Sequence, residues 1–532
     1  MGCADSQGAL LENSKDSCLV LIDDRLLTEG VVSIVTGNVA RPRIRHNDYS
    51  PLDPPELGHW TPTLPVSVVI PAHSGQHRLD LTLAALSAQS YPDSLLDVIV
   101  VDDASDPPLR LPEIRPGNTR LIRSAPDGWG PAHALNTGVA VAEGAVIQRL
   151  DSDMIIHREH LEALLRWHHL TDYVVTIGAK QFIEEPDVSP AEVRDAVAAD
   201  RLETLLDLSR AVPSSTERTI VRLDGLRRSR NPYHVCTGPT LSLPRSLFQD
   251  VGGLNGAVQR GEDTEFAYRL AQAGAVFVPD MKARAEHLGL PSQRRNRATS
   301  VRAVEPFLAN LVPLRRDLRK DRGRIWRVPY VEVVMEVAGV AERVVRQAVN
   351  AALTGTIHDV RVTLVAPWAA VAPGRMPDHG GLALELRLLL ESLSDDPRVA
   401  LVENLVPNAA PVPFRLRCTA DTPLAPTTLE RMTRAMIDGQ LGMLLVNFSD
   451  GRHAVLERTE AVNRARLLVE RGETIAAVVH ETYGVRQSPS SSFWPAPEAE
   501  AEEPAETPEP GTPQRRPIRE RLNPFLRQEP DF

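Results

Sequence analysis

Short apolar runs alternate with stretches of helical periodicity between residues 66 and 170, and this alternation constrains the fold more than any other feature. The apolar runs are VSVVIPA, DVIVVDD, TRLIRS and GAVIQRL, each of a length that suits one buried strand. The helical stretches are HRLDLTLAALSAQS, PAHALNTGVAVA and REHLEALLRWHHL. Because parallel strands are joined by helical crossovers that cover the sheet, the pattern predicts an α/β fold with a mostly parallel sheet.

Three of the predicted strands end in residues that suit a binding site. They end at Pro71-Ala72, at Asp102-Asp103 and at Asp151-Ser152-Asp153. Ligands of such sheets bind beyond the carboxyl ends of the strands, so we expect these residues to face a ligand. An Asp-x-Asp turn at such an edge suits a divalent cation that is bound by oxygen and shared with a diphosphate.

Composition excludes several classes of protein. The four cysteines are far apart in the 532 residues and form no Cys-x-x-Cys pair, which argues against a disulfide framework and a thiolate zinc site. The formal net charge of -11 argues against nucleic acid as a partner. No apolar run has the length of a membrane span, and the N-terminus lacks the pattern of a signal peptide. We therefore expect a cytoplasmic protein.

The chain divides into five predicted segments. Residues 1–60 form an extension with short strands, which ends in the Pro-rich PLDPPELGHWTPTLP, and residues 61–290 form the main α/β domain. Residues 291–355 form a basic helical connector, and residues 356–486 form a smaller C-terminal α/β domain with strands at VRVTLVAPW, RVALVEN and LGMLLVNF. Residues 487–532 are rich in Pro and Glu and are predicted to be a disordered tail.

Two features of the sequence concern contact with a membrane: a basic segment and an N-terminal acylation pattern. The segment 293–327 holds eleven Arg or Lys against three acidic residues, which fits either a solvated linker helix or a surface for anionic lipid or a pyrophosphate-bearing acceptor. The second interpretation predicts peripheral contact with the inner face of the membrane. The N-terminal MGCADS matches a pattern for acylation of Gly2 that is common by chance.

A further acidic group lies at the start of a predicted helix. In GGLNGAVQRGEDTEFAYRLAQAG, the residues Glu262, Asp263 and Glu265 fall in the first helical turn. Carboxylates at this position also stabilise a helix through its dipole, so a purely structural role is the alternative. His287, in ARAEHLG, is an imidazole that would complete a metal site if the fold brings it to the Asp-x-Asp turn.

These motifs together carry a resemblance. The ordered series VSVVIPAHSG, VIVVDDAS, PAHALNTGVAVAEGAVIQRLDSDMI and GGLNGAVQRGEDTEFAYRL, followed by a histidine, resembles the family 2 glycosyltransferases, which have the Rossmann-like GT-A fold of nucleotide-diphospho-sugar transferases. The resemblance covers residues 66 to 290. It implies an enzyme that moves a sugar from a nucleoside-diphosphate sugar to the hydroxyl of a glycan, lipid-linked or small-molecule acceptor.

The resemblance also implies a role for each site residue. Pro71 and Ala72 approach the nucleotide, Asp103 binds its base, and Asp151 lies near the ribose and the donor sugar. Asp151, Asp153 and His287 would hold Mg2+ or Mn2+. Asp263 would be the catalytic base that deprotonates the acceptor, giving a single displacement with inversion at the anomeric carbon. The implied setting is cell-wall, polysaccharide, glycolipid or natural-product biosynthesis in a bacterium.

Other functions remain open on the residues alone. A nucleotidyltransferase would need a Gly-rich loop after its first strand, and PAHSGQHR has one glycine. A hydrolase would place Asp153 and Asp263 on either side of a glycosidic bond. A catalytically inactive nucleotide-sugar-binding scaffold is the non-enzymatic alternative. The C-terminal domain also contains two short segments similar to the main domain, VRVTLVAPW and NFSDGR, which are consistent with a degenerate second copy of the transferase fold but are too short to favour it.

Overall fold

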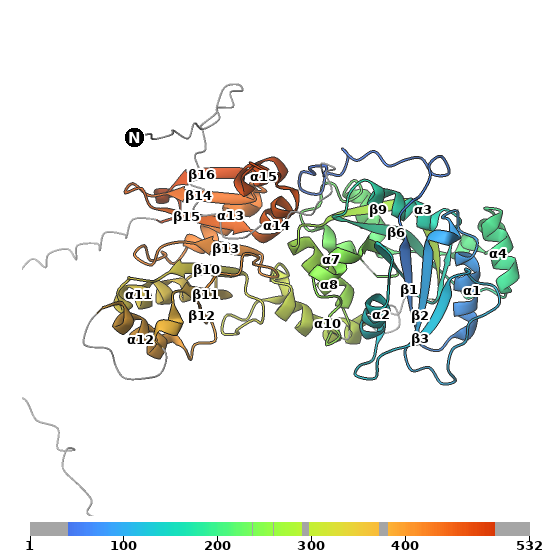
Figure 1. Cartoon of the computed structure of the whole chain (residues 1–532), viewed down its shortest axis with the longest axis horizontal. Helices are drawn as coiled ribbons and strands as arrows, with labels where there is room; N and C mark the ends of the chain where they lie inside the picture. Colours follow the sequence, from blue (N-terminus) through green and yellow to red (C-terminus); the bar gives the residue numbers. More distant parts are fainter. Residues whose placement is uncertain (1–40, 237, 259, 290–296, 372–380, 495–532) are drawn as a thin grey trace, which may run out of the picture. The chain divides into compact units, whose positions relative to one another are not determined.

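The computed structural model describes residues 41–236, 238–258, 260–289, 297–371 and 381–494. Its first sheet has the strand order β3-β2-β1-β4-β8-β6-β9-β5, with β7 paired to β6 (Figure 1). The strands β3, β2, β1 and β4 are parallel, β8 is antiparallel to β4 and to β6, and β9 is parallel to β6. The bounds are β1 Val66–Ala72, β2 Leu96–Asp102, β3 Thr119–Arg123, β4 Val146–Leu150, β5 Met154–Ile156, β6 Val174–Ile183, β7 Val212–Pro213, β8 Thr240–Pro244 and β9 Val276–Leu288. The predicted α/β fold is confirmed.

Helices cover both faces of this sheet, which explains why β1 and β2 are mostly apolar. On one face α1 packs against Val66, Val68 and Ile70, and on the other α2, α7 and α8 pack against Val69 and Ile99 (Figure 1). The bounds are α1 Gln76–Leu86, α2 Pro131–Ala140, α3 His160–Leu165, α4 Pro190–Ala198, α5 Leu202–Leu205, α6 Ser215–Arg222, α7 Arg245–Asp250 and α8 Glu262–Gln272. The parallel strands therefore end together at one edge.

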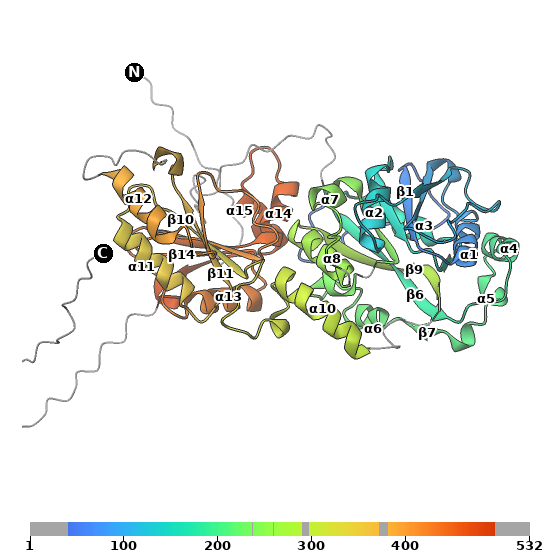
Figure 2. The same cartoon turned by 90° about the horizontal axis from the view of Figure 1, so that it is seen from below.

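A second sheet follows, with the strand order β12-β11-β10-β13-β15-β14-β16. Its helices α11, α12 and α13 pack on one face, and α11 and α12 lie side by side (Figure 2). The bounds are β10 Val331–Glu336, α11 Glu342–Leu353, β11 Val360–Val365, α12 Leu382–Leu393, β12 Val399–Val402, β13 Phe414–Arg417, α13 Thr428–Asp438, β14 Met443–Asn447, β15 His453–Arg458, α14 Thr459–Leu468, α15 Ile475–Thr482 and β16 Val485–Pro489. The smaller C-terminal α/β domain thus has a sheet of its own.

Two predicted boundaries are wrong. The connector was expected to reach residue 355, but β10 and α11 already belong to the second sheet, because β10 pairs with both β11 and β13. The tail was expected from residue 487, but residues 485–489 form β16, which pairs with β14. The expected strands in 1–40 and most of the predicted tail lie outside the described residues.

The described part of the basic segment, residues 297–327, is helical over only part of its length. It forms α10 (Arg297–Leu311), and Leu308, Leu311 and Val312 pack into the core of the first sheet. Beyond this helix, Arg316 and Arg319 pair with Asp359. Contact of this segment with a membrane stays a prediction. Among the helices of the described ranges, none combines the length and the apolar character that crossing a bilayer requires.

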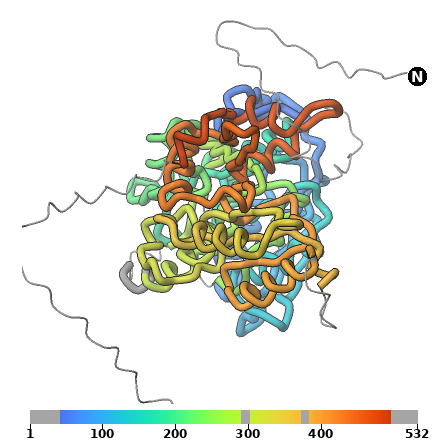
Figure 3. The backbone as a smooth tube through the Cα atoms, turned by 90° about the vertical axis from the view of Figure 1, so that its left-hand side faces the viewer, coloured from blue at the N-terminus to red at the C-terminus, as the bar shows by residue number. Residues whose placement is uncertain are grey.

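The two sheets share one hydrophobic cluster. It joins Tyr173, Val174 and Val276 of the first sheet to side chains of β14, β15, α14 and α15. Residues 41–52 run along α14 and α15, with Arg43 paired to Glu473 and Glu481 (Figure 3). From α14, the buried Arg464 donates to four carbonyl oxygens, those of Ile44, His46, Gly274 and Ala275. The start and the end of the described chain therefore meet at this cluster.

Candidate active site

Three predicted metal ligands lie together at the carboxyl edge of the first sheet. Asp151, Asp153 and His287 each offer one ligand atom, and these atoms lie within 4.8 Å of one another. His287 Nε2 is 3.7 Å from Asp153 Oδ1. Two carboxylates and an imidazole are ligands that Mn2+ and other divalent cations accept. The donor set therefore fits the divalent cation that was expected from the sequence.

Strand pairing brings His287 to the Asp-x-Asp turn across more than a hundred residues. The short β5 follows Asp153 directly and runs antiparallel to β9, with Met154 opposite His287. The backbone N–H of Leu288 donates to the carbonyl oxygen of Asp153 at 2.9 Å. Burial raises the pKa of Asp153, and the neighbouring His287 works against this rise. The three side chains are half-buried, so the cluster lies at a wall of the site that solvent reaches.

A second group of predicted residues lies where β1 and β2 end. The backbone N–H of Asp103 donates to the carbonyl oxygen of Ala72, the residue after Pro71, at 2.8 Å. Asp103 is 4% exposed, and its Oδ2 accepts from the N–H of Gly130 at 2.8 Å. Its Oδ1 is buried and has no partner among the residues that the structure describes. One carboxylate oxygen of Asp103 is thus left for a ligand.

Asp102 differs from Asp103 in this respect. Its two carboxylate oxygens accept from the backbone N–H groups of Ser105 at 3.0 Å and Leu109 at 3.2 Å. These bonds fix the loop that follows β2, which is a structural role. The geometry therefore favours Asp103 over Asp102 for ligand binding, and Asp103 is the acid to which the resemblance assigns the base.

The predicted base lies in the first turn of α8. Asp263 Oδ2 accepts from the N–H of Gly238 at 2.9 Å, and Asp263 Oδ1 is paired with Nη1 of Arg149. The nitrogen Nε of the same arginine lies 3.2 Å from Asp151 Oδ1. Gly261 caps the helix with φ of 84°, a backbone conformation that suits glycine. Arg149 therefore links Asp263 to Asp151 of the Asp-x-Asp turn.

Sequence reasoning missed three charged residues of this site. Arg149 is buried on β4, and Lys180 is buried on β6, where desolvation lowers its pKa. Glu262 precedes the base, and burial followed by the charge of Asp263 raises its pKa to about 7. The sequence did contain one signal for Arg149, which is the arginine in the apolar run GAVIQRL. A basic residue in a buried strand needs a nearby acid to compensate its charge.

Glu262→Gln is expected to stabilise the protein at alkaline pH. A carboxyl whose pKa is higher in the folded chain binds extra protons there, so its cost appears as the pH rises from about 4.5 towards 7. We expect the amide to raise the free energy of unfolding by about 3 kcal/mol at pH 8, and by less at pH 5.5. Urea unfolding at the two pH values measures both gains. Equal gains at both values would contradict the assignment.

Comparison with known proteins gives a family match for part of the chain. The sequence model of glycosyl transferase family 2 matches residues 67–252, which include Asp103, Asp151 and Asp153. The chain is 24% identical over 360 residues to a chondroitin synthase of Escherichia coli, covering 63% of this chain and 50% of the relative. It is 32% identical over 216 residues to a pre-mycofactocin glycosyltransferase of Mycobacterium tuberculosis, covering 40% of each chain. The chain thus spans half or less of the length of these relatives.

Solved structures include a mannosyltransferase of Pyrobaculum calidifontis in complex with GDP-Man and Mn2+. The likeness has a TM-score of 0.33 at 18% identity, and it covers 47% of this chain and 65% of that one. The relatives that the chain matches over part of its length are named as glycosyltransferases and synthases. Residues 67–252 of this chain thus carry the sequence features of glycosyl transferase family 2.

Proposed function

We propose that this chain transfers a sugar from a nucleoside-diphosphate sugar to an acceptor hydroxyl, with inversion at the anomeric carbon. The observation that carries the proposal is the convergence of Asp151, Asp153 and His287 at the sheet edge, next to Asp263. The first three are a donor set for a divalent cation, and the fourth is a carboxylate suited to accept a proton. A glycan is the acceptor class that fits the family best.

Each side chain has a defined part in this reaction. Asp151, Asp153 and His287 would hold Mn2+ or Mg2+, which when bound stabilises charge on the leaving diphosphate. Asp103 accepts a hydrogen bond from the nucleobase at its free Oδ1. Asp263 accepts the proton of the acceptor hydroxyl through one carboxylate oxygen while that hydroxyl oxygen attacks the anomeric carbon. The helix α8 and Gly238 hold Asp263 in place for this step.

The free oxygen of Asp103 limits the donor's base. An acceptor atom at this place is satisfied by a ring N–H, which uracil and thymine present at N3 and guanine at N1. His73 contacts the carbonyl oxygen of Asp103 through Nδ1 at 2.7 Å, and its ring packs edge-on against Trp129. Trp129 is 67% exposed, although its neighbour Gly130 is bonded to Asp103. We propose that the base stacks on the exposed face of the Trp129 ring.

Trp129→Phe is expected to remove a fluorescence signal of nucleotide binding. A base that stacks on an exposed indole quenches its fluorescence, so the quenching disappears in Trp129→Phe, whereas Trp129→Ala also removes the aromatic face and weakens binding by about tenfold. Titration of UDP and GDP in the presence of Mn2+ measures both effects. Trp60→Phe serves as the control, since Trp60 lies against Glu162 and His169 and should leave the quenching intact. Undiminished quenching in Trp129→Phe would place the base elsewhere.

The proposal as a whole is tested by donor binding. UDP-, GDP- and dTDP-sugars are screened with and without Mn2+ by thermal shift and calorimetry, on the wild type and on Asp153→Asn. We expect one class of donor to stabilise the wild type only with the metal, and the variant to lose this stabilisation. Asp450→Asn, a change at an exposed acid of the second sheet, is the matched control. Absence of binding by every donor would refute the proposed function.

A further inference from the structure

Arg149 is a buried cation for which the proposed reaction has no role so far. Its side chain is 6% exposed, and it comes from β4, in the middle of the first sheet. Its Nε donates to Asp151 and its Nη1 donates to Asp263. One planar guanidinium therefore contacts both a proposed metal ligand and the proposed catalytic base. Burial alone would lower the pKa of Arg149, but the negative charges of Asp263 and Asp151 outweigh this effect and raise the pKa above its ordinary value.

The surrounding backbone leaves room for this guanidinium. A Cβ atom at Gly238 would lie 2.1 Å from Cζ of Arg149, so any other residue there would displace the arginine. The N–H of the same Gly238 donates to the second oxygen of Asp263. Asp263 is therefore held from two sides, by an arginine on a strand and by a glycine N–H. The guanidinium of Arg149 therefore occupies space that exists only because residue 238 is a glycine, unlike that of an arginine exposed on the surface.

We propose that Arg149 is a positioning residue that fixes Asp263 relative to Asp151, a role that rests on the proposed function. A guanidinium offers several N–H groups in a rigid plane, so it can hold two carboxylates at a set separation. A lysine ammonium at the same place is a single point charge and cannot span both acids in the same geometry. Displacement of a reacting group by about 1 Å costs about 100-fold in rate, so this support matters for turnover.

Chemical rescue tests this role. The rate of nucleoside diphosphate release from the donor is measured for Arg149→Ala, which leaves a cavity of the size of the lost group. We expect a rate about 100-fold below wild type, with metal-dependent donor affinity changed by less than threefold. Added guanidinium chloride is expected to restore at least tenfold of the rate, whereas methylammonium chloride at equal ionic strength restores none. Arg149→Lys is expected to stay slow.

Arg166→Ala is the matched control. Arg166 is likewise buried and paired to Asp280, but it contacts neither Asp151 nor Asp263 in the described structure, so guanidinium should not accelerate this variant. A normal rate in folded Arg149→Ala, or equal acceleration of both variants, would overturn the positioning role. A wild type that releases no nucleoside diphosphate from any donor would instead refute the proposed function itself.

The second sheet carries an independent inference, because it repeats the first. Seven strands of the first sheet, in the order β3-β2-β1-β4-β8-β6-β9, match β12-β11-β10-β13-β15-β14-β16 in chain order and in every parallel or antiparallel pairing. The helix α11 follows β10 and packs on the corresponding face, as α1 does after β1. The two short similar segments of the sequence lie on strands that do not correspond, since VRVTLV forms β11, the counterpart of β2.

Register identifies the counterpart of each site residue. Val66 of β1 lies opposite Leu96 and Val146, and Val331 of β10 lies opposite Val360 and Phe414. Counting along the strands from these anchors gives the residues of the second sheet that replace the site. Ala366 and Pro367 stand for Asp102 and Asp103, and Thr419 and Asp421 stand for Asp151 and Asp153.

The residues at these positions of the second sheet cannot provide the metal ligands and the base that the first sheet provides. Asp421 is paired to Arg452 at 2.8 Å, and a hydrogen bond from Thr419 lowers its pKa. The helix α15, the counterpart of α8, has no acidic residue in its first turn, and β16 ends without a histidine. The hollow of about 370 Å3 where β10, β11 and β12 end is lined by Glu336 and Glu403, whose charges oppose a diphosphate.

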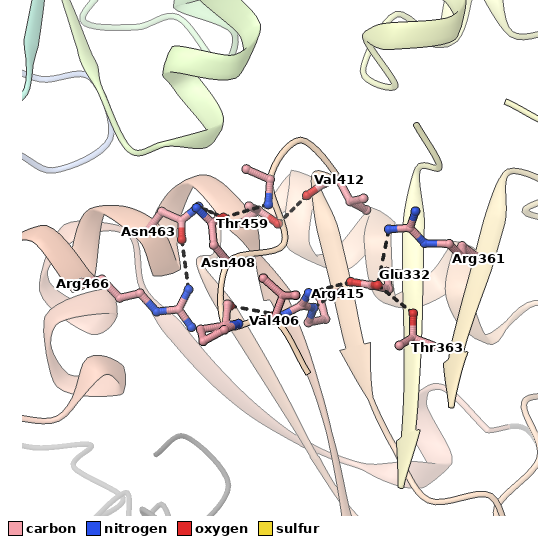
Figure 4. A network of polar contacts seen from close by, with 12 residues as sticks. Glu332, Arg361, Thr363, Val406, Asn408, Val412, Arg415, Thr459, Asn463 and Arg466 are labelled. Carbon is pink, nitrogen blue, oxygen red and sulfur yellow. Dashed lines mark hydrogen bonds and ion pairs between the residues drawn. The ribbon is translucent and has the colours of Figure 1, made fainter. Parts of the chain in front are cut away.

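The second sheet has also diverged where α2 covers the first. Residues 403–413 join β12 to β13 without a helix, and the sheet face beneath carries charges instead. Figure 4 shows Glu332 of β10 between Arg415 and Thr363, each at 2.8 Å, with Arg361 beyond. We infer that residues 331–489 are a second copy of the transferase fold that binds no donor and supports the first copy through their shared hydrophobic cluster.

Binding stoichiometry tests this inference with a matched pair of variants. Calorimetry with the nucleotide sugar and Mn2+ is expected to give one site per chain in the wild type and in Asp421→Asn, and none in Asp153→Asn. Two sites per chain, or a loss of binding in Asp421→Asn that is unaccompanied by unfolding, would overturn it. If the wild type bound no nucleotide sugar, the donor site proposed for the first copy would be refuted. That result would still agree with a second copy that binds no donor.

Discussion

Asp263→Asn is expected to lower the rate of sugar transfer by about 10²- to 10⁴-fold. The amide keeps the size of the side chain and can still accept from the N–H of Gly238, but it cannot take a proton from an acceptor hydroxyl. Donor binding should change by less than threefold, because Asp263 does not belong to the cluster of metal ligands. The loss is therefore expected in kcat rather than in donor affinity.

Steady-state kinetics and calorimetry on the same preparation separate these quantities. Asp250→Asn, at the exposed end of α7, is the control for the loss of one carboxylate and is expected to keep the wild-type rate. If Asp263→Asn also kept its rate, the acceptor proton would have to go elsewhere. Glu262, which precedes it on α8, would be the next residue to substitute.

Arg464→Leu is expected to have the largest effect on stability. The guanidinium is 2% exposed and donates to four backbone carbonyl oxygens, of Ile44, His46, Gly274 and Ala275. Leucine leaves these buried acceptors without a donor, and each unsatisfied group costs about 1–3 kcal/mol before relaxation. We expect a loss of about 3–5 kcal/mol in the free energy of unfolding.

Urea unfolding of wild type and variant measures this loss. Arg434→Ala is the control, because Arg434 forms an exposed pair with Glu430 on α13 that contributes about 0.5 kcal/mol at most. Similar losses in the two variants would show that Arg464 is not a link between the sheets. A large loss in Arg464→Leu alone would show that the two copies are stable only together.

The sequence predicted the four parallel strands β1 to β4 of the nine-stranded first sheet, because each of them reads as a short apolar run. It also pointed to Asp151, Asp153 and His287, but only the resemblance to a family joined them, since the pairing of Met154 with His287 is set by β5 and β9. Nothing local in the sequence specifies such a contact across so many residues.

The start of the second sheet was missed for a related reason. VEVVME contains two glutamates, so it does not read as a buried strand, and it was assigned to a connector. Glu332 is nevertheless buried, because Arg415, which is 83 residues away in the chain, neutralises its charge. Arg149 was missed in the same way, because its partner Asp263 is 114 residues away. A charged residue can be predicted to be buried only when its distant partner in the chain is known.

The cluster shared by the two sheets also bears on how the chain is made. Tyr173, Val174 and Val276 leave the ribosome long before Met443, Val462 and Val479, which cover them in the finished protein. A nascent chain therefore exposes this apolar surface until α14 and α15 have been synthesised, and such surfaces are where chaperones bind and aggregates begin. The first sheet should accordingly reach its final packing only after translation has passed α15.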